Sequence, residues 1–111
     1  MNYKFGDVLL SEVQYTDTFE TKLRPVLVLF EESGNIVIAG ITSNLKMKGI
    51  PLTKKDGLPK ESRIKLNYIF TISEKMVRRF LLKISDEKIK LIKEEIIKKL
   101  LGSKKQCATT P

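Results

Sequence analysis

The stretch "RPVLVLFEESGNIVIAGIT", residues 24–42, decides the fold class of this chain. Two apolar segments, residues 24–32 and 36–42, flank the turn residues Ser-Gly-Asn at 33–35. Runs rich in Val, Leu and Ile on both sides of a short Gly-Asn turn are typical of a β-hairpin in the middle of a sheet. The sequence therefore predicts a central antiparallel hairpin, to which the remaining strands are added.

Shorter segments of the same kind lie before and after the hairpin. They predict strands at residues 7–13, 49–53, 62–67 and 79–85. Pro51 places the second of these at a sheet edge or a bend, because proline has no N–H to donate to a ladder. Residues 73–79 predict one short helical turn, with Ser73 as its N-cap.

A longer helix is predicted over residues 86–102. Its isoleucines and leucines recur at helical spacing, Ser85 is a candidate N-cap, and Gly102 stands where a left-handed residue would end the helix. The polar face mixes Lys with Glu, which favours packing on the chain's own sheet or on a twin subunit over a membrane surface.

The length and the pattern of elements indicate one small domain. A chain of 111 residues fits a single compact unit, predicted over residues 1–102 and followed by a flexible tail at 103–111. Many closely spaced strands, few helices and basic loops predict a mainly β fold with a C-terminal α-helix, a small barrel of the SH3-like kind.

The charge balance favours a polyanionic partner. Lys and Arg number 21 against 13 Asp and Glu, and the isoelectric point is near 9.6. A solvated lysine-rich surface and a nucleic-acid-binding surface both explain this excess. The second interpretation fits best in one middle stretch with few acidic residues, which carries Lys46, Lys48, Lys54, Lys55, Lys60, Arg63 and Lys65.

The sequence also indicates where the protein acts. Its apolar runs are far shorter than the roughly 20 residues that cross a bilayer, and the N-terminal residues do not resemble a signal peptide. The single Cys107 has no intramolecular partner, which fits a reducing compartment. A cytoplasmic location is therefore expected.

Arg24 and Thr42 stand at the same end of the predicted hairpin. Pro25 fixes φ at the next residue, which would hold Arg24 at the mouth of its strand, and antiparallel pairing would bring Thr42 opposite. Structural explanations also exist: Arg24 could pair with Asp7 or Glu20, and Thr42, like its neighbour Ser43, could cap backbone groups at the strand end.

Five segments in order, from Lys4 to about Leu101, resemble the PemK/MazF family of toxin endoribonucleases from type II toxin–antitoxin systems. They are "GDVLLSEV", "KLRPVLVL", "IVIAGITSN", "IPLTKKDGLPKESRIKLNYIFTI" and the terminal helix. The resemblance implies a CcdB/Kid/MazF-type barrel, a homodimer, metal-independent cleavage of single-stranded RNA, and inhibition by an antitoxin peptide in the RNA groove. It also implies that the catalytic arginine is Arg24 and the catalytic threonine Thr42, with no cofactor.

Substrate contacts are expected from the polar loops beside these residues and from the basic middle stretch. The candidates are Tyr15, Thr16, Lys22, Ser43, Asn44, Lys46, Lys48, Lys65 and Asn67. The chain departs from the family at two places. It has Asn67 where many members have an acidic residue, and Phe70 where many have an arginine. These two differences predict slower cleavage or altered specificity.

The residue types suit cleavage by the RNA's own 2′-hydroxyl. Arg24 can offer a fork of donors to a pentacoordinate phosphorane, and Thr42 a hydroxyl. The chain has no His, which excludes a ribonuclease built on paired imidazoles, and it shows no convincing metal-ligand cluster. Two alternatives remain open: a non-catalytic nucleic-acid-binding barrel, and a gyrase poison of the same fold, although that family relies on a C-terminal Trp, which this chain lacks.

Overall fold

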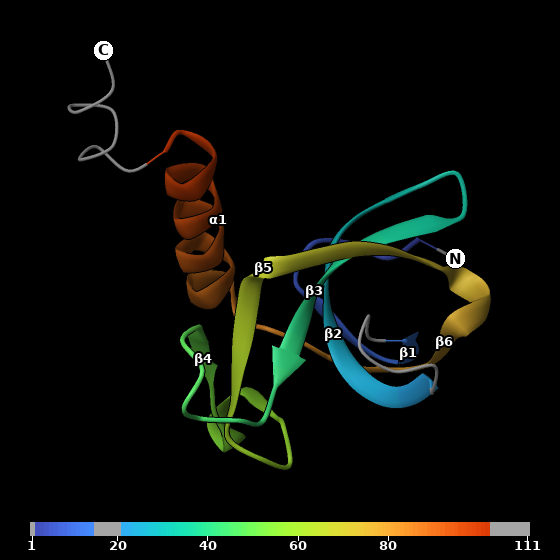
Figure 1. Cartoon of the computed structure of the whole chain (residues 1–111), viewed down its shortest axis with the longest axis horizontal. Coiled ribbons are helices and arrows are strands. Elements are labelled where there is room, and N and C mark those ends of the chain that lie inside the picture. The colour runs from blue at the N-terminus through green and yellow to red at the C-terminus, as the bar shows by residue number, and fades with distance from the viewer. Residues whose placement is uncertain (1, 15–20, 103–111) are drawn as a thin grey trace.

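The computed structural model describes residues 2–14 and 21–102. They form one antiparallel six-stranded sheet, in the order β4-β5-β3-β2-β1-β6, and one C-terminal α-helix (Figure 1). The strands are β1 (Asp7–Gln14), β2 (Thr21–Glu32), β3 (Asn35–Thr42), β4 (Ile50–Leu52), β5 (Ser62–Ser73) and β6 (Val77–Lys83), the 3-10 turns η1 (Lys54–Asp56) and η2 (Glu74–Met76), and the helix α1 (Asp86–Leu100).

The predicted mainly β fold with a C-terminal helix is confirmed. The sheet curves strongly but stays open, because its edge strands β4 and β6 do not pair with each other. Figure 1 shows β1, β2 and β6 curling around one side, α1 and β4 on the other, and β3 and β5 running between them.

As predicted, Pro51 lies on an edge strand. The predicted tail, residues 103–111, lies outside the described residues, as does Cys107.

The short helix predicted over residues 73–79 is wrong in extent. Only Glu74–Met76 forms a helical turn, and the Ser73 side chain caps it by accepting a hydrogen bond from the Lys75 N–H. The chain then returns to extended backbone at Val77, because this segment finds a partner in β1, where Val77 pairs with Ser11. Tertiary strand pairing thus overrides the local helical preference.

The central hairpin closes through a two-residue turn. Glu32 pairs with Asn35, and the turn residues between them both have positive φ, 52° at Ser33 and 81° at Gly34. This geometry matches the twist of antiparallel strands and favours glycine, which has no Cβ to clash. Further along, Leu29 is an extra residue on β2, since the pairing steps from Phe30–Val37 to Val28–Ile38.

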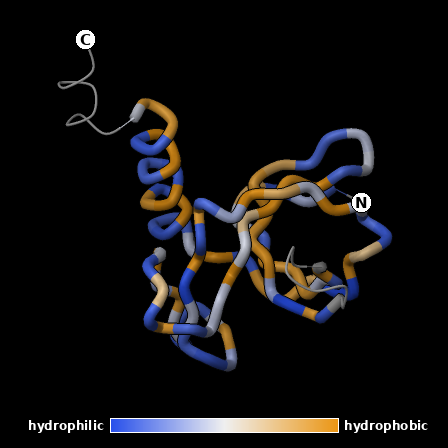
Figure 2. Tube along the Cα trace, in the orientation of Figure 1, coloured by the Kyte–Doolittle hydropathy of each residue, from blue (hydrophilic) through white to orange (hydrophobic). Residues whose placement is uncertain are grey.

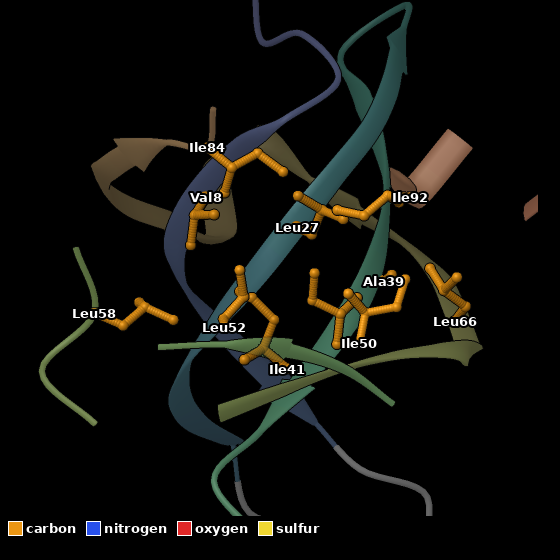
Figure 3. Packing of buried hydrophobic residues seen from close by; sticks show 11 residues of the cluster. Val8, Leu27, Ala39, Ile41, Ile50, Leu52, Leu58, Leu66, Ile84 and Ile92 are labelled. Atoms are coloured by element: carbon orange, nitrogen blue, oxygen red, sulfur yellow. The ribbon is translucent and has the colours of Figure 1, made fainter. Parts of the chain in front are cut away.

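Both faces of the sheet are buried, so neighbouring residues on one strand belong to different parts of the core. Val8, Leu27 and Ala39 pack in a first cluster, which reaches toward α1 through Ile92 (Figure 3). Residues on the other face of the sheet pack in a second cluster: Leu9, Val13, Val26, Val28, Ile36, Ile38 and Ile72. Figure 2 shows the resulting hydrophobic runs along the strands and the alternation of hydrophilic and hydrophobic residues along α1.

The terminal helix has the predicted caps and packs on the chain's own sheet. Ser85 accepts a hydrogen bond from the Lys88 N–H at 3.2 Å, and Gly102 has a left-handed φ of 73°. Ile92 is fully buried, whereas Leu100 is 80% exposed. Within residues 2–14 and 21–102, no helix is long and apolar enough to span a membrane.

Replacing Ile92 with Ala should destabilise the fold strongly. Removing a fully buried Ile side chain loses transfer free energy and leaves a cavity, at a cost of about 2–5 kcal/mol. The matched control is Leu91→Ala on the same helix, where the side chain is 44% exposed and the loss should be much smaller. Urea unfolding followed by circular dichroism measures both; equal losses for the two variants would mean that α1 does not dock through Ile92.

Candidate functional site

A row of polar side chains crosses four strands of the sheet, on the face of the second cluster. Ser11 on β1 pairs with Arg24 on β2, and Thr42 on β3 pairs with Arg63 on β5. The ladder between β2 and β3 runs to the pair Val26–Gly40, and continuing this register by two residues sets Arg24 across from Thr42. Because residues directly opposite each other share a face of the sheet, these four side chains lie on one face.

Pro25 explains why the ladder between β2 and β3 stops here. The residue pairs between β2 and β3 end at Val26, one residue short of Pro25, which has no N–H to donate. The expectation that Arg24 opens its strand is wrong, because β2 begins at Thr21. Arg24 lies instead in the fourth position of the strand, half-buried, just beyond the last β2–β3 pair.

The Thr42 hydroxyl also shapes the loop that follows β3. Its oxygen accepts a hydrogen bond from the Asn44 N–H at 3.1 Å, and the Asn44 side chain accepts one from the Lys46 N–H at 3.0 Å. The strand-end cap considered for Thr42 therefore exists. A hydroxyl can accept and donate at once, so the Thr42 proton remains available to a ligand.

Lys65 ties this loop to β5. It is only 9% exposed, and its Nζ donates a hydrogen bond to the Lys48 backbone oxygen at 3.0 Å. It also lies 5.3 Å from the ring centre of Tyr68, within range of a cation–π interaction. Gly49 allows the backbone of this loop to lie close to β5, because a Cβ at Gly49 would lie 2.5 Å from the Ile64 backbone oxygen.

A hollow of about 460 Å³ lies beside this contact. Its wall brings together three of the residues predicted from sequence, Lys48, Lys65 and Asn67, with Glu95 and Lys99 from α1. Lys65 belongs both to the wall of the hollow and to the sheet face that carries Thr42. It lines the hollow, and it shares the face of Thr42 because it pairs with Gly40, two residues before Thr42.

The other predicted residues lie around this region or outside the description. Lys22 is exposed and pairs with Val13, which puts it on the Arg24 face of β2. Ser43, Asn44 and Lys46 are exposed in the loop after β3. Tyr15 and Thr16 fall outside the described residues, as does Glu20, one of the acidic partners considered for Arg24.

Asp7, the other partner considered for Arg24, is engaged elsewhere. Its carboxylate accepts a hydrogen bond from the Lys4 N–H and lies 3.7 Å from Lys83 Nζ. The β1–β2 register pairs Arg24 with Ser11, four positions along the strand from Asp7. This pairing does not support a structural ion pair between Arg24 and Asp7.

Sequence reasoning placed Arg63 in the basic stretch but did not assign it to the site. The alternation Arg-Ile-Lys-Leu at 63–66 was the available signal, because a period of two puts Arg63 and Lys65 on one face of a strand. Lys99 was missed because it is distant in sequence from the strands it joins. Among the described side chains, no group of three or more acidic, His or Cys residues could hold a metal ion.

The arrangement suits an anionic ligand. Arg24, Arg63, Lys65 and Lys22 supply cations on the face where Thr42 supplies a hydroxyl. Guanidinium groups offer planar forks of donors that match phosphate oxygens. The adjoining hollow adds further amines and the Asn67 amide. A polyanion with a phosphate at Thr42 would meet positive charge on both sides.

Two comparisons with known proteins bear on the family and the fold of this chain. Residues 4–100 match the sequence model of a family described as the PemK-like, MazF-like toxins of type II toxin–antitoxin systems. The fold is similar to that of an endoribonuclease from a mycobacterial species, solved in complex with its cognate antitoxin. The TM-score is 0.67 at 14% sequence identity, over 91% of this chain and 94% of the other. The predicted fold class and the resemblance found in the sequence are both confirmed.

Proposed function

The chain belongs to the PemK-like, MazF-like toxins of type II toxin–antitoxin systems, and from this we propose that it cleaves single-stranded RNA at short sequences without a metal ion. The observation that carries the proposal is the register that sets Arg24 across from Thr42, beyond the last pair of the β2–β3 ladder. A guanidinium and a hydroxyl there can hold one phosphate between them.

The reaction uses the RNA's own nucleophile. The 2′-oxygen attacks the adjacent phosphorus, its proton leaves to solvent, and a pentacoordinate phosphorane forms. The bond to the 5′-oxygen then breaks, and that oxygen takes up a proton, which leaves a 2′,3′-cyclic phosphate and a 5′-hydroxyl. Arg24 stabilises the charge that develops on the non-bridging oxygens, and Thr42 donates a hydrogen bond to one of them. A guanidinium stays protonated near neutral pH, so charge stabilisation is the role that suits Arg24.

The RNA on either side of the scissile phosphate follows the cationic residues. Lys22 lies on the Arg24 face, and Lys46 and Lys48 lie in the loop after β3. Ser43, Asn44 and Asn67 supply hydrogen-bonding groups of the kind that recognise the edges of unpaired bases. Tyr15 and Thr16, in the segment between β1 and β2, are proposed to complete this surface.

The partner of such a toxin is an antitoxin. The mycobacterial relative was solved with its cognate antitoxin, and we propose that a peptide of this kind neutralises the present protein by covering the RNA surface. An acidic peptide segment would compete for the same cations as RNA. The cytoplasm, where messenger RNA is found, is the proposed place of action.

The protein is expected to form a homodimer. Large apolar side chains remain exposed on the helix and on an edge strand, with Ile97 at 54%, Leu100 at 80% and Phe80 at 52%. Self-association would cover such surface and an open sheet edge. Light scattering on a size-exclusion column should give twice the chain mass at micromolar protein; a monomer mass that does not change with concentration would contradict the dimer.

RNA binding should weaken steeply with salt. Cations that neutralise phosphates release counterions, so log affinity falls by about 0.7 per contact for each unit of log salt. Replacing Lys46 and Lys48 together with Ala should flatten this slope, while Lys90→Ala on the exposed face of α1 should leave it unchanged. Fluorescence anisotropy at several salt concentrations gives the slopes. An unchanged slope in the double variant would place the RNA path elsewhere.

Replacing Arg24 with Ala should slow cleavage by about two to three orders of magnitude and leave most RNA affinity intact. Loss of one donor to a transition state typically has this size. Arg24→Lys should restore little, because an ammonium cannot reproduce the bidentate fork. Thr42→Val, nearly isosteric, should also impair cleavage. Single-turnover cleavage of a short RNA in EDTA, with melting temperatures for each variant, measures these effects.

Two controls separate a nuclease from a binder. RNA with a 2′-deoxy sugar at the scissile position should bind and stay intact, because it lacks the nucleophile. A structural role for Arg24 would instead lower the melting temperature and keep the activity of each folded molecule. An Arg24→Ala protein that cuts RNA at the wild-type rate would show that the catalytic assignment is wrong.

A further inference from the structure

We propose that Arg63 is a second phosphate-binding guanidinium, which contacts the scissile phosphate from the side opposite Arg24. The proposal rests on the RNA cleavage proposed above. In the row, Thr42 on β3 lies between Arg24 on β2 and Arg63 on β5. Its partner on β5 is Arg63, and the residue across from it on β2 is Arg24.

The distances between strands allow both arginines to reach one group. Neighbouring strands lie about 4.8 Å apart, so the backbones of β2 and β5 are roughly 10 Å apart across β3. Arg24 and Arg63 share a face with Thr42, and a phosphate held at the Thr42 hydroxyl would lie midway between them. Two long side chains can converge on a group placed in this way.

The surroundings of Arg63 favour a ligand over a structural partner. The side chain is half-buried, and its Nε atom is buried without a hydrogen-bond partner among the described residues. Buried donors are nearly always satisfied in folded proteins, and one left open costs free energy unless something else fills it. On the other side, β4 places Pro51 opposite Arg63, and the proline side chain has no atom that could accept a hydrogen bond from the guanidinium.

The nearest acidic residues in sequence are already engaged. The Glu61 carboxylate accepts a hydrogen bond from the Lys54 N–H at 3.0 Å. The Asp56 carboxylate accepts one from the Thr53 N–H at 2.8 Å and lies 4.0 Å from Lys88 Nζ. Neither carboxylate forms an ion pair with Arg63 among the described residues, so this guanidinium is available to an external anion.

The chemistry makes use of a second cation. A phosphodiester carries one negative charge, and charge accumulates on the non-bridging oxygens as the phosphorane forms. One guanidinium can bind the phosphodiester in the ground state. A second guanidinium, already in position, stabilises the charge that is added in the transition state. Arg63 should therefore affect the rate of cleavage more than the affinity for RNA.

Arg63 lies beyond the apolar part of its face of β5. Phe70 packs against the second apolar cluster. The β3–β5 register shifts between Ala39–Ile69 and Gly40–Lys65, and as a result Arg63 lies on the same face of the sheet as Phe70. On this face, β5 therefore passes from the apolar side chains of Phe70 and Ile72 to the cations Lys65 and Arg63, and Arg63 is the one paired with Thr42.

The test compares Arg63→Ala with Arg79→Ala. Arg79 is exposed on β6 and pairs with Leu10, whose side chain is on the opposite face from Ser11. Single-turnover cleavage should fall about 10- to 100-fold in Arg63→Ala and less than about 2-fold in Arg79→Ala. Binding of RNA with a 2′-deoxy scissile sugar should fall no more than about 3-fold in either variant. Arg63→Lys should recover only part of the rate.

The double variant Arg24→Ala/Arg63→Ala tests whether the two arginines share one phosphate. If they do, the combined loss should be smaller than the product of the single losses, because groups acting on one site are not independent. The proposal would be overturned if the rate loss of the double variant equalled the product of the two single losses. It would also be overturned if the Arg63→Ala protein cleaved RNA like the wild type or lost only thermal stability. Failure of the wild-type protein itself to cleave RNA would instead overturn the proposed function.

Discussion

The register between β2 and β3 is the constraint on which the site depends. If the pairing of Glu32 with Asn35 continued along the hairpin without interruption, Arg24 would face Ser43. The extra residue at Leu29 moves the register by one position, and Arg24 then comes across from Thr42. Because side chains alternate between the two faces of a sheet, a shift of one residue decides which groups can act together.

The two-sided core confines the cationic residues to one end of this face. Along β2, Val28 and Val26 belong to the second apolar cluster, and the next residues on the same face are Arg24 and Lys22. The change from apolar to cationic side chains coincides with the end of the β2–β3 ladder at Pro25. Charged groups therefore stand where the β2–β3 ladder ends, next to a packed core that fixes their backbone.

A second irregularity, a shift in the β3–β5 register, positions the residues that β5 contributes to the site. Three residues, Leu66 to Tyr68, lie between the pairs Gly40–Lys65 and Ala39–Ile69. They allow Leu66 to pack in the first cluster while Asn67 lines the hollow and Tyr68 lies beside the Lys65 amine. The same strand can in this way hold apolar residues of both clusters and present Arg63 and Lys65 beside Thr42.

The sequence by itself determined the strands, the hairpin and the helix, and the polar and basic residues at their ends. Alternating apolar residues, the Ser33–Gly34 turn, Pro51 and the caps Ser85 and Gly102 act locally, so the strands, the hairpin and the helix could be predicted from them. The excess of basic residues and the Arg-Pro and Thr-Ser-Asn segments also indicated where an anionic substrate would bind.

Only the tertiary structure decided which of these residues meet. The bulge at Leu29 and the shift on β5 result from pairing between strands, and no local pattern fixes a register to one residue. The extent of η2 depended on pairing with β1 in the same way. Arg63 and Lys99 join the site only through contacts between distant segments, because packing and strand pairing act across the fold rather than along the chain.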